Sequence, residues 1–153
     1  MIDVTLVAYG KIKQENLQAL EREYLKRLQP YARVKIEELK AESFSKSNQA
    51  AAKKIEGERL TNYLSNCRGT DIFLLAEKGE ELDSVEFSKK INNFSSPLIL
   101  VIGGALGFSP EIFSAYQKLS LSKLTFPHEF ARVLLLEQLY RAVTIDNQKA
   151  YHY

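Results

Sequence analysis

The chain is poor in cysteine and in long apolar runs. Its single cysteine, Cys67, permits neither an internal disulfide nor a cysteine-based metal site, and its place on a helical pattern near Leu64 favours a packing role. No apolar run approaches the ~18 residues that span a bilayer. The sequence from Met1 has strand character instead of a basic leader followed by an apolar segment. We therefore expect a cytoplasmic protein with no metal centre and no membrane association.

The remaining composition is that of an ordinary globular protein. Of the 153 residues, 45% are hydrophobic and 26% are charged, which provides enough apolar material for a proper core. We find no repeat, no low-complexity tract and no domain boundary. We expect a single domain over residues 1–153.

The net charge is small but unevenly placed. It is +2 overall, yet residues 1–70 hold 13 Lys and Arg against 9 Asp and Glu, whereas residues 71–153 hold 8 against 10. The basic half is either a solvated helix face or a surface that faces RNA. Charge alone does not decide between the two.

Strand and helix patterns alternate along the chain. Strand character is found at residues 2–8, 34–39, 71–76, 98–102 and 121–126, and helical spacing at residues 17–28, 48–66, 83–93, 109–118 and 128–145. Asp83 with Glu86 forms a capping-box pattern, and Ser109 followed by Pro110 marks another helix start. This alternation predicts an open α/β sheet.

The last helix is apolar around more than one face. Such a helix needs burial on two sides, which in a chain this small suggests a subunit interface as well as a core. We therefore expect a homodimer formed through residues 128–145.

Two strand ends have the character of ligand sites. The run at 98–102 breaks at Gly103-Gly104-Ala105-Leu106-Gly107, where the missing side chains allow close approach of backbone to another group. A second strand end follows at residues 121–126. Open α/β sheets bind small ligands at this carboxyl edge. A tight turn with no ligand is the alternative.

The glycine segment matches neither common nucleotide motif. It is not G-x-G-x-x-G, and it follows the fourth expected strand instead of the first, which argues against a nicotinamide enzyme. The chain also lacks G-x-x-x-x-G-K-[ST], which argues against an NTPase. What remains is an uncharged or cationic ligand held by backbone groups and apolar walls.

At these residues the sequence resembles the ribosomal RNA large subunit methyltransferase H family, also called RlmH. The resemblance covers essentially the whole chain, and its carboxyl-terminal motifs are specific. They are I-G-G-x-x-G-[LF]-S-P at residues 102–110, L-S-K-[LM]-T-F-P-H at 121–128, R-V-L-L-x-E-Q-L-Y-R-A at 132–142 and the terminal Tyr151-His152. Two positions depart from the family pattern, because Gln148 stands where a glycine is common and Tyr153 where a basic residue is usual.

The resemblance implies a SPOUT-type open sheet with helices on both faces and a carboxyl-terminal trefoil knot. It implies a homodimer that binds S-adenosylmethionine in the knot and methylates N3 of pseudouridine-1915 in 23S rRNA, within the assembled ribosome. Composition shows none of this, and general topology rules argue against knots. The alternative from the residues alone is a non-catalytic α/β module that binds ribosomal RNA or a nucleotide-like metabolite. A purely structural dimer gives no reason for two ligand-type strand ends.

The resemblance also assigns site residues. The family's cofactor contacts fall on positions at three strand ends, namely Leu75, Gly103, Leu121, Ser122, Lys123, Leu124, Thr125 and Phe126. For RNA contact or proton handling we select Arg132, Arg141 and His152, because the N3 proton must be lost and nearby positive charge favours the anion. His128 has the character of a helix-start residue more than of a base. No unique general base is apparent.

Overall fold

The computed structural model describes all residues 1–153 and contains five strands and five helices. The strands are β1 (Ile2–Tyr9), β2 (Ala32–Leu39), β3 (Asp71–Glu81), β4 (Leu98–Ile102) and β5 (Gln117–Ser120). The helices are α1 (Glu15–Leu28), α2 (Gln49–Ser65), α3 (Ser84–Asn92), α4 (Pro110–Ala115) and α5 (His128–Asp146). The predicted alternation of strands and helices is confirmed. No helix of the structure is long and apolar enough to cross a membrane.

The five strands form one parallel sheet in the order β2-β1-β4-β3-β5. The central strand β4 is buried at all five positions, as expected of a parallel strand covered on both faces. Alternate residues of β4 therefore enter two different cores. Leu98, Leu100 and Ile102 face one, whereas Ile99 and Val101 face the other.

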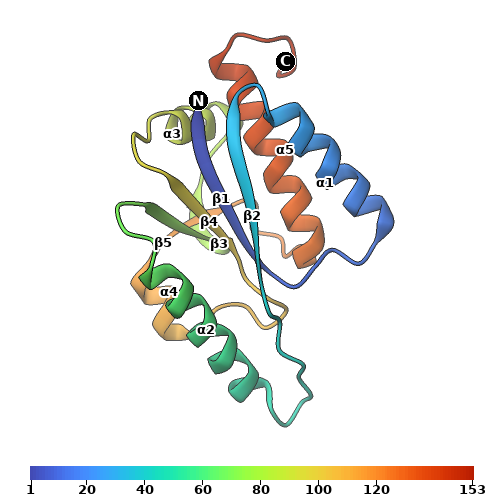
Figure 1. The fold of residues 1–153 in the computed structure, drawn as a ribbon, viewed down its shortest axis with the longest axis vertical. Coiled ribbons are helices and arrows are strands. Elements are labelled where there is room, and N and C mark those ends of the chain that lie inside the picture. Colours follow the sequence, from blue (N-terminus) through green and yellow to red (C-terminus); the bar gives the residue numbers. More distant parts are fainter.

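Helices cover both faces of the sheet, as the family resemblance implies. On one face α1, α3 and α5 bury Leu28, Ile91 and Leu139 against the first core. On the other face α2 and α4 bury Leu60 and Ile112 against the second. Figure 1 shows α5 running beside α1, with the C-terminal tail at the end of α5 opposite the carboxyl ends of the strands.

The apolar character of α5 is accounted for within one chain. This helix packs between α1 and α3 as well as on the sheet. The hydroxyl of Ser88 on α3 donates to the Ala142 carbonyl over 2.7 Å, and the ring of Tyr24 on α1 lies 6.3 Å from that of Tyr140. The two-faced pattern is therefore no argument for a partner subunit, and the homodimer stays a prediction.

Three boundaries differ from the expectations. The fifth strand, predicted at residues 121–126, is wrong, because β5 is Gln117–Ser120 and the residues after it form a loop. The helix expected to reach residue 118 ends at Ala115. β3 is longer than predicted, because its end at Glu80 and Glu81 pairs again with β5 after a register shift. The capping box of Asp83 and Glu86 at the start of α3 is present as predicted.

Candidate cofactor site

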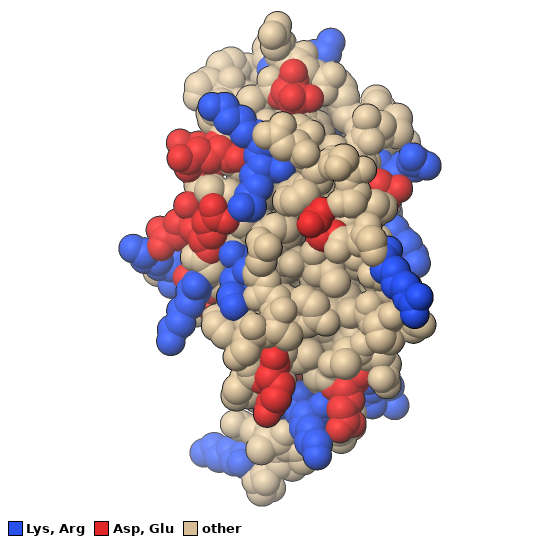
Figure 2. All heavy atoms as spheres, turned by 90° about the vertical axis from the view of Figure 1, so that its left-hand side faces the viewer, with Lys and Arg blue, Asp and Glu red and all other residues tan.

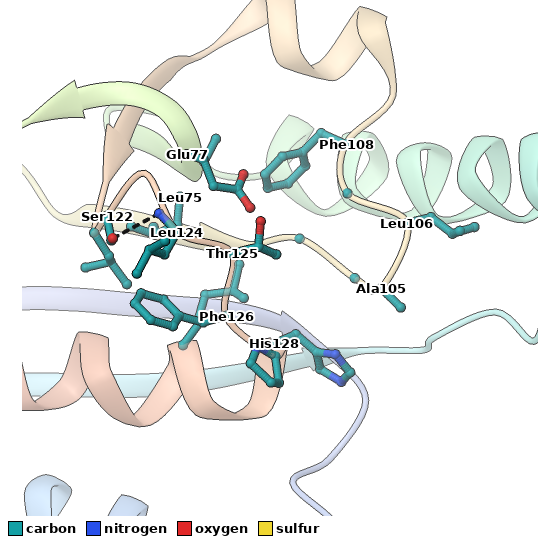
Figure 3. Close-up of a pocket in the computed structure, with 18 of the residues that line it drawn as sticks. Leu75, Glu77, Ala105, Leu106, Phe108, Ser122, Leu124, Thr125, Phe126 and His128 are labelled. Atoms are coloured by element: carbon teal, nitrogen blue, oxygen red, sulfur yellow. Dashed lines mark hydrogen bonds between the residues drawn. The ribbon is translucent and has the colours of Figure 1, made fainter.

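A cleft of about 740 Å³ opens at the carboxyl end of β4, beside the bend in β3. Its volume lies within the range of small-molecule sites. We call it the strand-end cleft (Figure 3). Three chain segments supply most of its lining, namely residues 75–77 at the bend in β3, residues 102–108 after β4, and residues 121–128 after β5 without Lys123. Lys53 of α2, Phe113 of α4 and Ala131 of α5 complete it.

The first wall is the glycine loop, residues 103–108. The Gly107 N–H donates to the Gly104 carbonyl over 3.0 Å, which closes a tight turn, and Gly107 has a φ of +71°, in the left-handed region that favours glycine. A Cβ placed on Gly103 would lie 3.3 Å from the ring of Phe108. The loop thus exposes backbone to the cleft at positions where a side chain would be crowded by the Phe108 ring, at Gly103, or strained in its backbone conformation, at Gly107.

The second wall is the second loop, residues 121–127. Ser120 anchors its start, because its hydroxyl lies 3.0 Å from the Ser122 carbonyl and 3.3 Å from the carbonyl of Glu77. The Leu124 N–H donates to the Ser122 hydroxyl over 3.0 Å, the dashed line in Figure 3. These bonds hold the loop beside the bend in β3. The apolar residues that suggested a strand, Leu121, Leu124 and Phe126, line the cleft instead.

Seven of the eight predicted cofactor residues line the strand-end cleft. They are Leu75, Gly103, Leu121, Ser122, Leu124, Thr125 and Phe126. The exception is Lys123, whose side chain is 80% exposed and lies 3.5 Å from a carboxylate oxygen of Glu81. The structure thus brings together residues from the bend in β3, the end of β4 and the loop after β5, whereas their role in binding stays a prediction.

Sequence reasoning missed several residues of the cleft. Glu77 directs its carboxylate into the cleft, near Thr125 and Phe108 (Figure 3). Its position just after the predicted third strand was a usable signal, because ligand residues gather at strand ends. Lys53 lies on α2, and no sequence motif indicates that this helix borders the cleft. His128 is both the first residue of α5, as expected, and part of the lining.

Arg132 lies behind the cleft and is buried, with 3% of its side chain exposed. Its guanidinium donates to the carboxylates of Glu21 on α1 and Glu38 on β2, and its Nη1 lies 3.4 Å from the Gly10 carbonyl. A small hollow beside it is also bordered by Gly103 and His128. Four of the five N–H groups of the guanidinium are thus engaged by protein groups, which favours a structural role over direct RNA contact.

Arg141 and His152 lie at the other end of α5. Thirteen residues of helix separate Arg141 from His128, which is about 20 Å at 1.5 Å per residue. The structure therefore does not bring Arg141 and His152 to the cleft of their own chain. They belong to what we call the tail cluster, made of Glu137, Arg141, Tyr151 and His152.

The tail cluster is held by charged hydrogen bonds. Arg141 donates to Glu137 over 2.6 Å and its Nη1 lies 3.3 Å from Nδ1 of His152. The Tyr151 hydroxyl donates to Glu137 over 3.0 Å, and the Arg141 guanidinium lies 4.8 Å from the Tyr151 ring. The bond to Glu137 raises the pKa of Arg141. Burial, with hydrogen bonds to Tyr24 and Glu137, raises the pKa of Tyr151, so this phenol stays protonated.

Part of the basic charge in the first half of the chain is locally paired. Arg27 contacts Glu23, Lys35 contacts Glu37, and Arg59 contacts Glu42, each within 2.8 Å. On the face shown in Figure 2, acidic and basic side chains are interspersed around a broad uncharged area. On this face the charge distribution favours a solvated surface over one large basic patch. No group of three or more His, Cys, Asp or Glu side chains is arranged to hold a metal ion.

Comparison with known proteins identifies the class to which this fold and cleft belong. A family model described as "Predicted SPOUT methyltransferase" matches residues 2–152. A probable methylase family protein from Haemophilus influenzae has the same fold, with a TM-score of 0.60 at 12% identity over 96% of this chain and 67% of that one. A putative RNA methyltransferase from Bacillus anthracis gives a TM-score of 0.53 at 9% identity, over 98% and 99% of the two chains. The protein is a SPOUT methyltransferase.

Curated relatives narrow the class further. The chain is 42% identical to the ribosomal RNA large subunit methyltransferase H of Kosmotoga olearia, over 94% of this chain and 95% of that protein. It is 41% identical to the protein of the same name from Dictyoglomus thermophilum, over 99% and 100%. The chain belongs to the ribosomal RNA large subunit methyltransferase H family, as the sequence motifs predict.

Proposed function

We propose that this protein transfers a methyl group from S-adenosylmethionine to N3 of a pseudouridine in large-subunit ribosomal RNA, at the position known as pseudouridine-1915 in 23S rRNA. One observation carries the proposal. Residues expected to bind the cofactor come from the bend in β3, the end of β4 and the loop after β5, and they line one cleft. The names of the relatives, which describe large-subunit rRNA methyltransferases, support the RNA substrate.

The cleft suits S-adenosylmethionine. Leu75, Leu124 and Phe126 provide apolar walls for an adenine, and the glycine loop lets the ligand approach backbone closely. Lys53 and Glu77 provide one charge of each sign for the ionised amino-acid end. When bound, the cofactor supplies an already activated methyl group. The protein has to orient that methyl group toward the nucleotide and keep the attacking nitrogen free of its proton.

A carboxyl-terminal trefoil knot is part of the proposal. Leu119 of β5 pairs with Leu75 and again with Glu80, so residues 76–79 form a bulge within β3. A Cβ on Gly79 would lie 2.5 Å from the carbonyl carbon of Leu119, which means that this bulge touches the β5 backbone. The close contact of β3 with β5 is compatible with a knot, and the threading of the chain itself is what family membership implies.

A homodimer would explain the place of the tail cluster. Arg141 lies ten residues beyond Ala131, the last residue of α5 that lines the cleft, which is about 15 Å of helix, and His152 lies beside Arg141. We therefore place their contribution to the reaction at the cleft of a second subunit. Exposed apolar side chains on α1 and α5, Leu20 and Phe130, are available for such an interface. Sedimentation at micromolar concentration tests the proposal: we expect twice the mass of the 17.5 kDa chain, and a purely monomeric protein contradicts it.

In this proposal the three predicted polar residues have two different roles. Arg141 and His152 contact RNA and favour the N3 anion by positive charge and hydrogen bonding. Arg132 instead positions the first turn of α5, which carries His128 and Ala131 into the cleft. The substrate is the assembled ribosome, since a chain of this size borrows ribosomal surface for its specificity.

Calorimetry of the purified protein tests the cofactor. We expect saturable binding of both S-adenosylmethionine and S-adenosylhomocysteine, with one site per chain. Binding of neither compound contradicts the proposal and favours a non-catalytic RNA-binding module. ATP and NAD at the same concentrations are the specificity controls.

A further inference from the structure

Glu56 of α2 has a carboxylate oxygen that is buried and lacks a partner. The residue is 6% exposed, and its Oε1 accepts a hydrogen bond from the Glu42 N–H over 3.0 Å. Its Oε2 accepts none. Arg59, one turn further along α2, contacts Glu42 and the Lys40 carbonyl instead. A buried anionic oxygen without a donor is unfavourable, so its presence calls for an explanation.

The free oxygen lies against the glycine loop. A Cβ on Gly104 would be only 2.7 Å from Oε2, so the carboxylate occupies the space that glycine leaves open. The Tyr9 hydroxyl donates to the Glu56 carbonyl over 2.8 Å, which ties this turn of α2 to β1. Lys53, one turn earlier on α2, lines the strand-end cleft. Glu56 is therefore held rigidly at the back of the loop that forms one wall of the cleft.

The same loop carries backbone donors without acceptors. Gly107 uses its N–H to close the turn on Gly104, but the N–H groups of Gly104 and Ala105 donate to no protein group. The loop that packs against the unpaired acceptor thus carries two unpaired donors. A small change in the loop, of the kind that accompanies ligand binding, is enough to join them.

We infer that Glu56 is a positioning residue for the cofactor site: its Oε2 accepts the backbone N–H of Gly104 or Ala105 when the ligand fills the cleft, and so fixes the glycine loop. This inference rests on the proposed binding of S-adenosylmethionine. Glu56 does not touch the ligand. It acts through the loop, and it requires glycine at position 104 because any side chain there meets its carboxylate.

The substitution Glu56→Gln isolates this role. The amide retains the size of the side chain and can keep its oxygen toward the Glu42 N–H, which places the NH₂ group where Oε2 was. An NH₂ group cannot accept a hydrogen bond from the loop. Glu58→Gln, at an exposed position two residues along the same helix, is the matched control.

Three measurements on wild type and both variants decide the matter. Calorimetry gives the affinity for S-adenosylmethionine, thermal melting gives the stability of the free protein, and hydrogen exchange gives the protection of the Gly104 and Ala105 amides at saturating ligand. For Glu56→Gln we expect affinity lower by about tenfold or more, the worth of one hydrogen bond to a charged group. We also expect a melting temperature at least as high as that of wild type, and loss of the ligand-induced protection. Glu58→Gln should match wild type in all three.

The failure of this inference differs from the failure of the proposed function. If the wild-type protein binds no S-adenosylmethionine, the proposed function fails and the inference with it. If wild type binds, but Glu56→Gln binds within twofold and keeps the protection of the two amides, only the inference is overturned. A lower melting temperature with unchanged binding and protection also overturns it, since Glu56 would then have only a structural role.

Discussion

The guanidinium of Arg132 on α5 donates to the carboxylate of Glu38 on β2 over 2.6 Å, and it also contacts Glu21 on α1. One buried cation therefore joins three elements directly behind the cofactor cleft. The side chains of Glu21 and Glu38 remain 16% and 29% exposed. Their two ion pairs with Arg132 therefore form without complete loss of hydration of the carboxylates.

Replacing Arg132 tests whether its role is structural. Arg132→Met leaves two carboxylates without their cation, and we expect the free energy of unfolding to fall by about 3 kcal/mol, the lower end for buried pairs because both acids retain water contact. Denaturant unfolding measures this. Arg33→Met is the control, since Arg33 is 76% exposed and 3.9 Å from Asp3, and should change stability by less than about 0.5 kcal/mol. A variant as stable as wild type that lacks only methyl transfer would instead assign Arg132 to the substrate.

Gly103→Val should abolish cofactor binding in a folded protein. The new Cβ meets the Phe108 ring at 3.3 Å, and the valine methyl groups then force that ring toward the space of the ligand. We expect the affinity for S-adenosylmethionine to fall at least about tenfold, which calorimetry measures. Adding Phe108→Leu should restore part of the affinity, because it removes the ring that is displaced. Unchanged affinity in a folded Gly103→Val protein contradicts this account.

The sequence predicts the strands that have a clear apolar pattern. It does not predict a strand that forms only because it pairs with a neighbouring strand. β4 is recognisable because Leu98–Ile102 is entirely apolar. β5 has one buried residue, Leu119, and owes its existence to pairing with β3, so no local pattern indicates it. Leu121, Leu124 and Phe126 are the apolar residues that suggested a strand, but they lie in a loop and line the cleft.

The sequence identifies the lining of the site better than it identifies the polar groups around it. Glycines and strand ends mark the cleft, because both follow from local backbone requirements. Lys53 and Glu56 lie on α2, whose position depends on packing against the sheet and the glycine loop. Arg132 and Arg141 are nine residues apart on α5. Arg132 is buried behind the cleft, whereas Arg141 lies near the far end of the helix. Only the length and orientation of the helix in the structure reveal this difference.

The departure from the family pattern at Gln148 has a structural cost. Gln148 has a φ of +52°, in the left-handed region that favours glycine. The chain after α5 closes as a Schellman motif. In this motif the Lys149 N–H donates to the Thr144 carbonyl over 2.8 Å, and the Gln148 N–H donates to the Ile145 carbonyl over 3.1 Å. Glycine suits this position, so Gln148→Gly should raise the free energy of unfolding by about 1 kcal/mol. Gln148→Ala should bring no such gain, because alanine also has a Cβ. Equal stability of all three proteins in denaturant would show that the position is unstrained.

Removal of Tyr151–Tyr153 should separate binding from catalysis. The tail lies at the far end of α5 from the cleft of its own chain, so the truncated protein should retain its fold and its affinity for S-adenosylmethionine. Methyl transfer to ribosomal subunits should fall at least about tenfold, because Tyr151 and His152 are lost and Arg141 loses two contacts. A truncated protein that methylates at the wild-type rate would exclude a role for the tail.

Mass spectrometry of 23S rRNA from cells with and without this protein tests the central claim most directly. The account predicts that the fragment carrying the pseudouridine lacks one methyl group in cells without the protein. It also predicts that purified protein with S-adenosylmethionine restores the methyl group on intact ribosomes. The same methylation in both cell types, with no transfer by the purified protein, would contradict the account.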